Sequence, residues 1–162
     1  MASGKKKRKG VLIAIHQSLS YQLHDSIIDP KGRYIILQCI IDNRNFTLVN
    51  LYAPNVHQMA FIRSIVDKAK SLQWGHLLLC GDFNLAPDSA IDSSASPKKH
   101  YTSLSKFLWE SDLYDAWRCC HAGERDYSYL SPRHGTYSRI DLCITDKHLL
   151  DHISSIELHT AT

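Results

Sequence analysis

Four short apolar runs limit how this chain can fold. Each has the length of a β-strand and is rich in Ile, Val, Leu and aromatic residues. All are far shorter than the roughly 20 apolar residues of a membrane-spanning helix, so we expect a soluble domain built around a β-sheet. The runs are Gly10 to His16 (GVLIAIH), Arg33 to Asp42 (RYIILQCIID), Asn45 to Pro54 (NFTLVNLYAP) and His76 to Asn84 (HLLLCGDFN).

The segments that join these runs predict a hairpin followed by a helix. Residues 42–45 (DNRN) form a polar linker of a kind that tolerates positive φ, so the second and third strands should pair antiparallel. From Asn55 to Leu72 the apolar residues recur close to every 3.6 positions, which predicts an amphipathic helix with Asn55 as its N-cap. That helix should cover one face of the sheet.

The second half of the chain predicts a loop, another helix and further strands. Residues 85–99 are rich in Ser and Pro and should form an exposed loop. The helix should run from Ser103 to about Cys119, with a break expected near Ser111. Alternating strands and helices of this kind are typical of a layered α/β domain around one or two sheets. The further strands are expected at residues 127–130, 137–145 and 152–162.

The positive charge of the chain is concentrated in one short segment. The whole sequence has a formal charge of +3, but residues 5–9 (KKKRK) carry five positive charges, so the rest of the chain is nearly neutral, with a net charge of −2. Such a cluster suits a solvated arm or loop, a contact to phosphate backbones, or a nuclear address. The five cysteines include no C-x-x-C pair, which favours an intracellular protein with reduced thiols and no zinc site.

The end of the fourth run carries the most informative polar residues. In LLLCGDFN, Asp82 and Asn84 are alternate residues, so in extended backbone their side chains face the same way, while Gly81 lets another backbone approach closely. A carboxylate can take a proton from water, and a carboxamide can donate to a phosphate oxygen. By itself the pattern also fits a simple turn at the end of a strand.

Two further motifs add candidate residues. LYAPN places Tyr52 and Asn55 at a strand-to-helix junction, where backbone N–H groups and the helix N-terminus favour an anion. In SRIDLCIT, Asp141 is the one acid of an apolar strand, and a buried carboxylate needs a partner such as His, Arg or a metal-bound water. Each motif alone also has a structural interpretation, a helix cap for Asn55 and a salt bridge for Asp141.

The order of these motifs resembles that of a known superfamily. LYAPN, a helix, GDFN, a Ser-rich loop, DAWR, YSYL and SRIDLCIT follow one another as in the endonuclease/exonuclease/phosphatase superfamily. The chain looks closest to the endonuclease domain of long interspersed (non-LTR) retrotransposons, and it is also similar to exonuclease III and apurinic/apyrimidinic endonucleases. The resemblance implies a deoxyribonuclease I-like, four-layer α/β/β/α sandwich of two packed mixed sheets. Residues 10–162 would be part of such a domain, truncated at both ends, and residues 1–9 a basic arm or loop remnant.

The resemblance also implies an activity, Mg²⁺-assisted hydrolysis of DNA phosphodiesters, with Mn²⁺ as an alternative ion. Asp82 would activate or orient the attacking water and Asn84 would hold the scissile phosphate, and both would hold the metal directly or through water. Tyr52 would contact the phosphate or support the metal site, and Asp141 would pair with a catalytic histidine. Further contacts to phosphate or nucleic acid would come from Asn55, Ser128, Ser138 and Arg139.

The resemblance implies partners as well, and two departures from the family pattern leave alternatives open. DNA would be the substrate, a reverse transcriptase domain would be attached in a full-length element, and the protein would be a nuclear monomer. No Gln-Glu pair precedes the first strand, however, and none of the ten histidines follows Ser-Asp. We therefore expect impaired activity. The alternatives are a catalytically inactive fragment, a remnant that binds nucleic acid through the basic arm, and a phosphatase of the same superfamily.

Overall fold

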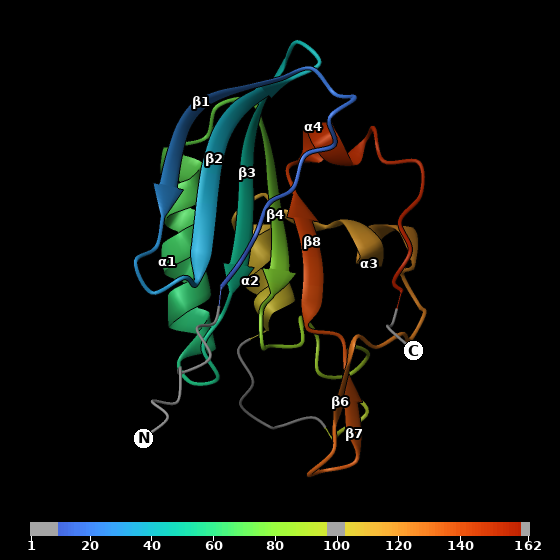
Figure 1. The fold of residues 1–162 in the computed structure, drawn as a ribbon. Helices are drawn as coiled ribbons and strands as arrows, with labels where there is room; N and C mark the ends of the chain where they lie inside the picture. Colours follow the sequence, from blue (N-terminus) through green and yellow to red (C-terminus); the bar gives the residue numbers. More distant parts are fainter. Residues whose placement is uncertain (1–9, 97–102, 160–162) are drawn as a thin grey trace, which may run out of the picture.

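The computed structural model describes residues 10–96 and 103–159 (Figure 1). The basic arm expected at residues 1–9 lies outside these ranges. In chain order the elements are β1 (Tyr21–Ile28), β2 (Tyr34–Ile41), β3 (Arg44–Tyr52), α1 (Gln58–Ser71), β4 (His76–Asp82), α2 (Leu104–Glu110), β5 (Tyr114–Asp115), α3 (Ala116–Cys120), β6 (Tyr129–Ser131), β7 (Thr136–Ser138), β8 (Asp141–Thr145) and α4 (Lys147–Leu150).

A six-stranded mixed sheet forms the centre of the structure, in the order β1-β2-β3-β4-β8-β5. Strands β1, β2 and β3 pair antiparallel, β3 and β4 are parallel neighbours joined through α1, and β8 runs antiparallel to β4. The β2–β3 turn places Asp42 and Asn43 at φ 47° and 63°, as a two-residue hairpin loop with positive φ at both positions requires. The predicted antiparallel hairpin is therefore confirmed.

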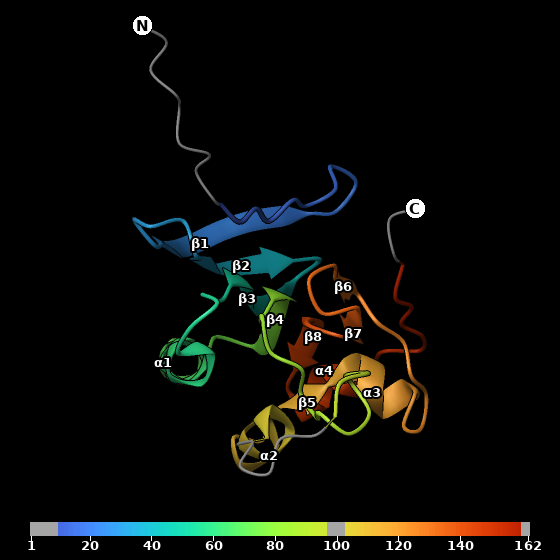
Figure 2. The same ribbon diagram turned by 90° about the horizontal axis from the view of Figure 1, so that it is seen from below.

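Helices α1 and α2 cover one face of this sheet, and α3 lies at the edge formed by β8 and β5 (Figure 2). Because side chains alternate along a strand, every second residue of the central strands points toward these helices. The apolar stripe predicted for the first helix faces the same layer. Together they form one hydrophobic core, which includes Val49, Leu51, Leu77, Leu79, Leu142, Ile144, Ile62, Ile65 and Val66.

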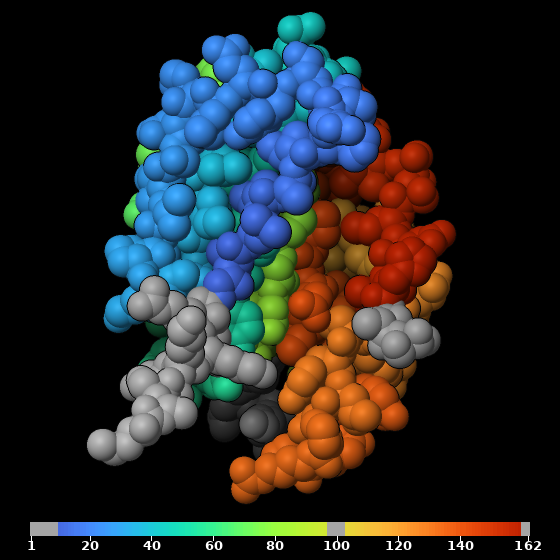
Figure 3. Space-filling model, in the orientation of Figure 1, coloured from blue at the N-terminus to red at the C-terminus, as the bar shows by residue number. Residues whose placement is uncertain are grey.

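The opposite face of the sheet is covered mainly by residues 10–16, which cross it as an extended segment (Figures 1 and 3). A carboxamide N–H of Asn50 donates to the Leu12 carbonyl over 2.7 Å. The segment alternates between half-buried and exposed positions but forms no strand, so the strand predicted there is wrong. Every second side chain of the segment is half-buried, although its backbone is not paired as a strand requires.

The predicted α/β class is confirmed, with one mixed six-stranded sheet and a second, two-stranded sheet of β6 and β7. Of the four layers expected from the resemblance, the described residues form one helical layer and one large sheet. Strand β1 is absent from the sequence-based prediction. Its side chains are almost all exposed, and a register shift between Leu23 and Asp25 interrupts the alternation that would have indicated a strand.

Both predicted helices are shorter than expected. Helix α1 begins at Gln58 after His57, a left-handed residue with no side-chain cap, so the prediction of Asn55 as N-cap is wrong. The second helix breaks near Ser111, as predicted, because Asp112 takes a left-handed φ of 55° and buried Leu113 turns the chain back toward the sheet. Among the described residues, no helix has the length and hydrophobicity to cross a membrane.

The strands of the C-terminal part also differ from the prediction. The run 137–145 is divided into β7 and β8, because the side chains of Arg139 and Ile140 both turn inward and are buried. Residues 152–159 form no strand, which corrects the final predicted strand as far as the structure describes it. Residues 160–162 lie outside the described ranges.

Candidate functional site

Three of the predicted site residues lie in a row across the sheet. Tyr52 at the end of β3 is paired with Asp82 at the end of β4, and Asp82 is paired with Asp141 at the start of β8. Side chains that face each other in a ladder project from the same face of the sheet. Their strand neighbours Leu51 and Leu142 are buried on the helical side, so the row is on the opposite face, the one that residues 10–16 cross. Motifs far apart in the sequence meet here.

Asp82 and Asn84 are brought together by a turn, not by the strand alternation that the sequence suggested. Strand β4 ends at Asp82, and Asn84 adopts a left-handed φ of 49°. The Asn84 backbone N–H donates to Asp82 Oδ1 over 2.8 Å, while its side-chain Nδ2 donates to the Ala53 carbonyl over 2.6 Å. One N–H of the carboxamide is thereby used inside the protein. Since the group carries two, the other can still serve a phosphate oxygen.

Gly81 has the role that the sequence predicted, close approach of another backbone. Its φ is +131°, and a Cβ added there would lie 2.0 Å from the Leu51 carbonyl oxygen. No larger residue fits between β3 and β4 at this point, so Gly81 sets the spacing of the two strands directly before Tyr52 and Asp82.

Asp141 differs from the prediction in its surroundings. It is exposed, so water solvates its carboxylate, and the structural requirement for a buried partner does not arise. Its backbone N–H and that of Ile140 both donate to Ser128 Oγ, each over 3.1 Å. Ser128 therefore positions the start of β8, and its hydroxyl proton remains available to a further acceptor.

Gln58 was missed by the sequence analysis and connects two of the motifs. Its Nε2 donates to the Asn55 carbonyl over 2.8 Å and to the Asn84 carbonyl over 3.4 Å. The LYAPN segment is thus linked to the GDFN turn through the first residue of α1. Asn55 itself is exposed beside this link. A glutamine at the start of a helix carries no sequence signal for such a role.

A groove lined largely by hydroxyl and carboxamide groups adjoins Asn84. It lies between the GDFN turn, the Ser-rich loop and the β6–β7 hairpin, and Ser138 is part of its wall. The hydroxyl oxygens of Ser93 and Ser138 are 3.4 Å apart across it. Hydroxyls and carboxamides are common donors to phosphate and sugar oxygens in protein–DNA contacts. The other residues of this groove that can form hydrogen bonds are Gln58, Ser89, Ser96, Tyr129 and Thr136.

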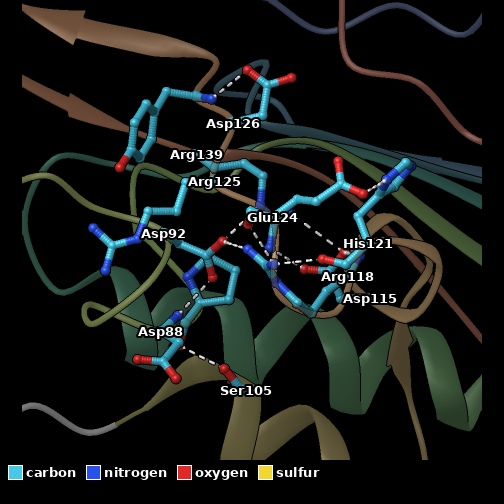
Figure 4. A network of polar contacts seen from close by, with 12 residues as sticks. Asp88, Asp92, Ser105, Asp115, Arg118, His121, Glu124, Arg125, Asp126 and Arg139 are labelled. Carbon is cyan, nitrogen blue, oxygen red and sulfur yellow. Dashed lines mark hydrogen bonds and ion pairs between the residues drawn. The ribbon is translucent and has the colours of Figure 1, made fainter.

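Arg139, which we expected to contact the substrate, is instead buried inside the protein (Figure 4). Only 1% of the residue is exposed. Its Nε donates to Asp92 Oδ1 over 2.8 Å, and its two terminal nitrogens donate to the Asp115 carboxylate over 3.2 and 2.7 Å. The guanidinium also lies over the Trp117 ring. Its donors are used to join the Ser-rich loop to α3, which corrects the predicted role.

The same cluster changes the interpretation of the Ser-rich loop. Asp92 is 1% exposed and accepts a second charged contact, from Arg118 over 2.6 Å. Asp115 also caps α3 by accepting the backbone N–H of Arg118. The loop predicted as exposed is therefore anchored at its middle. An acid among serines is typical of a solvated loop, and its cationic partners are distant in the sequence, so the sequence held no local signal of this burial.

The row of Tyr52, Asp82 and Asp141 provides some, but not all, of the ligands that a hard divalent cation needs. Asp82 and Asp141 face each other on one side of the sheet and supply carboxylate oxygens, the ligands that Mg²⁺ prefers. Mg²⁺ is commonly held by one or two carboxylates and completes its shell with water and phosphate oxygens. Within residues 10–96 and 103–159, no group of three or more His, Cys, Asp or Glu side chains converges on one point. The donors thus fit a metal shared with a phosphate, and not a closed protein cage.

Comparison with known proteins places this arrangement in a wider context. No family model matches the chain. Over 160 residues, 94% of the chain, it is 26% identical to an uncharacterized 149 kDa protein of transposon TX1 from Xenopus laevis. Its structure is similar to the endonuclease domain of TRAS1, a telomere-specific non-LTR retrotransposon, with 19% identity over 84% of this chain and a TM-score of 0.55. The 3′ phosphatase NExo from Neisseria matches over 80%, with 19% identity and a TM-score of 0.58.

These likenesses confirm the resemblance at the level of the fold. The chain has the deoxyribonuclease I-like fold of the endonuclease/exonuclease/phosphatase nucleases. One of the similar structures belongs to the retrotransposon branch that the motifs indicated. The chain spans 59% of the TRAS1 domain structure, 61% of the NExo structure and 12% of the transposon protein.

Proposed function

We propose that this chain is part of a metal-dependent endonuclease that hydrolyses phosphodiester bonds in DNA. The observation that carries the proposal is the row of Tyr52, Asp82 and Asp141 beside a groove of hydroxyl and carboxamide groups. Carboxylates next to neutral hydrogen-bond donors suit a substrate with bridging phosphates. The similar structures include a retrotransposon endonuclease domain and a 3′ phosphatase bound to a product DNA hairpin.

Each residue of the site has a definable task in this proposal. Asp82 orients the attacking water and accepts its proton, while the remaining N–H of Asn84 and the Tyr52 hydroxyl donate to phosphoryl oxygens. Asp82 and Asn84 would hold the divalent ion directly or through water, and Asp141 would add a second carboxylate opposite Asp82. The ion, when bound, offsets the charge that develops on the phosphoryl oxygens. Ser128 holds Asp141 in place, and Asn55 and Ser138 offer further contacts to the nucleic acid.

A nicking assay on supercoiled plasmid tests the proposal. The chain is incubated with Mg²⁺ or Mn²⁺, and Asp82→Asn is compared with Asp151→Asn, which removes an exposed carboxylate at the end of α4. We expect Asp82→Asn to slow metal-dependent nicking by about 100-fold or more and Asp151→Asn to leave it unchanged. Circular dichroism of both variants controls for folding. Equal nicking by the chain and by Asp82→Asn, or none by the chain with either ion, would refute the proposal.

A second candidate is a domain that binds nucleic acid without cleaving it. It is favoured by the incomplete set of metal ligands among the described residues. This candidate predicts DNA binding without nicking, with an affinity that falls steeply with salt concentration. Fluorescence anisotropy of a labelled duplex, with and without EDTA, distinguishes the two candidates, because binding without cleavage needs no divalent ion. A phosphatase would instead release phosphate from a 3′-phosphorylated oligonucleotide without nicking the plasmid.

The same proposal extends to the wider protein. The transposon relative is a 149 kDa protein of which this chain covers 12%, which supports a larger protein with further domains, and we propose a covalently attached reverse transcriptase as one of them. A nuclear location and a monomeric domain fit that arrangement. Size-exclusion chromatography with light scattering tests the monomer, and fractionation of cells that express a tagged chain tests the location.

A further inference from the structure

Two cysteines face each other across the sheet directly beside the candidate site. Cys80 on β4 is paired with Cys143 on β8 in the antiparallel ladder, and their sulfur atoms are 3.7 Å apart. Asp82 and Asp141 form the next pair on the same face; Asp82 lies two residues after Cys80, and Asp141 lies two residues before Cys143. Both cysteines carry free thiols. The proposed hydrolysis uses neither of them.

The geometry of this pair suits a disulfide. Paired residues of antiparallel strands have Cα atoms about 4.5 to 5.5 Å apart, inside the range of about 4.4 to 6.8 Å that a disulfide spans. The backbone is therefore already at a suitable distance. Side-chain rotation can bring the two sulfur atoms from 3.7 Å to the bonded distance of about 2 Å. The other three cysteines, Cys39, Cys119 and Cys120, lie on β2 and α3.

The surroundings also give the pair access to solvent. Both cysteines line a surface cavity together with Asp141 and Trp117, so a small oxidant can reach them. Two accessible thiols within contact distance are a common arrangement of a redox-sensitive pair.

We propose that Cys80 and Cys143 form a reversible cross-strand disulfide in the presence of a hydroperoxide. The thiolate form of one cysteine attacks one oxygen of hydrogen peroxide, which breaks the O–O bond and gives a sulfenic acid, while the leaving oxygen is protonated to water. The thiol of the other cysteine then attacks the sulfenic sulfur, its proton leaves with the hydroxyl as a second water, and the S–S bond forms. Two thiols are oxidised and one peroxide is reduced. A dithiol reverses the step by exchange.

The consequence is a covalent link between β4 and β8 next to the carboxylate pair. Residues 80 and 143 are separated by most of the second half of the chain, so the link closes a long loop in the unfolded state and stabilises the fold. We expect a higher Tm after oxidation in the chain but not in Cys143→Ser. This readout does not depend on hydrolysis, so the disulfide and the endonuclease proposal can fail separately.

Peptide mapping tests the proposal because trypsin places the cysteines in distinguishable peptides. Cys80 falls in residues 71–98 and Cys143 in residues 140–147, whereas Cys39 falls in residues 34–44 and both α3 cysteines in residues 119–125. The folded chain is treated with one equivalent of hydrogen peroxide, alkylated and digested without reductant. We expect the linked peptide 71–98 with 140–147, a loss of two hydrogens in the intact mass, and reversal by dithiothreitol.

Two variants control the result. In Cys143→Ser, Cys80 should accumulate as a sulfenic acid that dimedone labels, because its resolving thiol is gone. Replacing both exposed α3 cysteines, Cys119→Ser with Cys120→Ser, should leave the linked peptide unchanged. The proposal is overturned if Cys80 and Cys143 stay alkylatable after oxidation. A disulfide that involves the peptide 119–125, or one that joins two chains, would overturn it as well.

Discussion

Replacing Arg139 with Met should strongly destabilise the protein, because it removes the only cation that touches both Asp92 and Asp115 in the described structure. Met keeps most of the volume over the Trp117 ring but none of the three hydrogen bonds at 2.8, 3.2 and 2.7 Å. Removing one partner of a buried ion pair costs about 3–5 kcal/mol, because the remaining charge stays buried. Asp92 keeps Arg118 as a partner. We therefore expect a loss of about 4 kcal/mol, a large part of the usual total stability.

Urea unfolding followed by circular dichroism measures this loss. With a slope of about 2 kcal/mol per molar urea, the midpoint should fall by about 2 M. Lys106→Ala is the control, since the Lys106–Glu110 pair is 76% and 57% exposed and should contribute less than about 0.5 kcal/mol. Adding Asp115→Asn to Arg139→Met should recover part of the loss by removing the stranded charge, because Asp115 loses the ion pair with Arg139 while an Asn oxygen can still cap α3. A midpoint within about 0.5 M of the parent, with weaker DNA binding, would refute the structural role and restore Arg139 as a substrate contact.

Two further predictions concern other parts of the fold. Gly81→Ala should lower the free energy of unfolding by more than about 2 kcal/mol, because the added Cβ would lie 2.0 Å from a backbone carbonyl oxygen of β3. Gly123→Ala is the control and should be tolerated, since a Cβ added there has nothing within 4 Å. Similar urea midpoints for both variants would contradict this prediction. The Glu124 carboxylate, 3.1 Å from Nδ1, and the hydrogen bond to the Ile156 carbonyl raise the pKa of His121. The stabilisation that protonated His121 contributes is therefore complete below the unfolded pKa near 6.5 and is lost as pH rises through the higher folded pKa. Hydrogen exchange of residues 153–159 should therefore accelerate with pH beyond the intrinsic increase, and His121→Gln should abolish that excess.

The sequence by itself determined the features that depend on neighbouring residues. The length of the apolar runs 45–54 and 76–84 and their content of Val, Leu and aromatic residues indicated strands. The Asp42–Asn43 turn follows from the tolerance of these two residues for positive φ. The helical period of residues 55–72 identified α1 and its buried stripe. The motif order also indicated the fold, since LYAPN and GDFN each end a strand of the central sheet and SRIDLCIT contains another.

The tertiary structure alone decided which polar residues are buried and which face solvent. Asp141 and Asp92 exchanged their expected environments: the acid of the apolar strand is exposed, and the acid of the polar loop is buried. Arg139 pairs with partners 47 and 24 residues away, so no local window of sequence contains both charges. Burial of a charge is decided by whether a partner arrives from elsewhere in the chain, and the sheet register likewise brings Tyr52 and Asp141 to either side of Asp82.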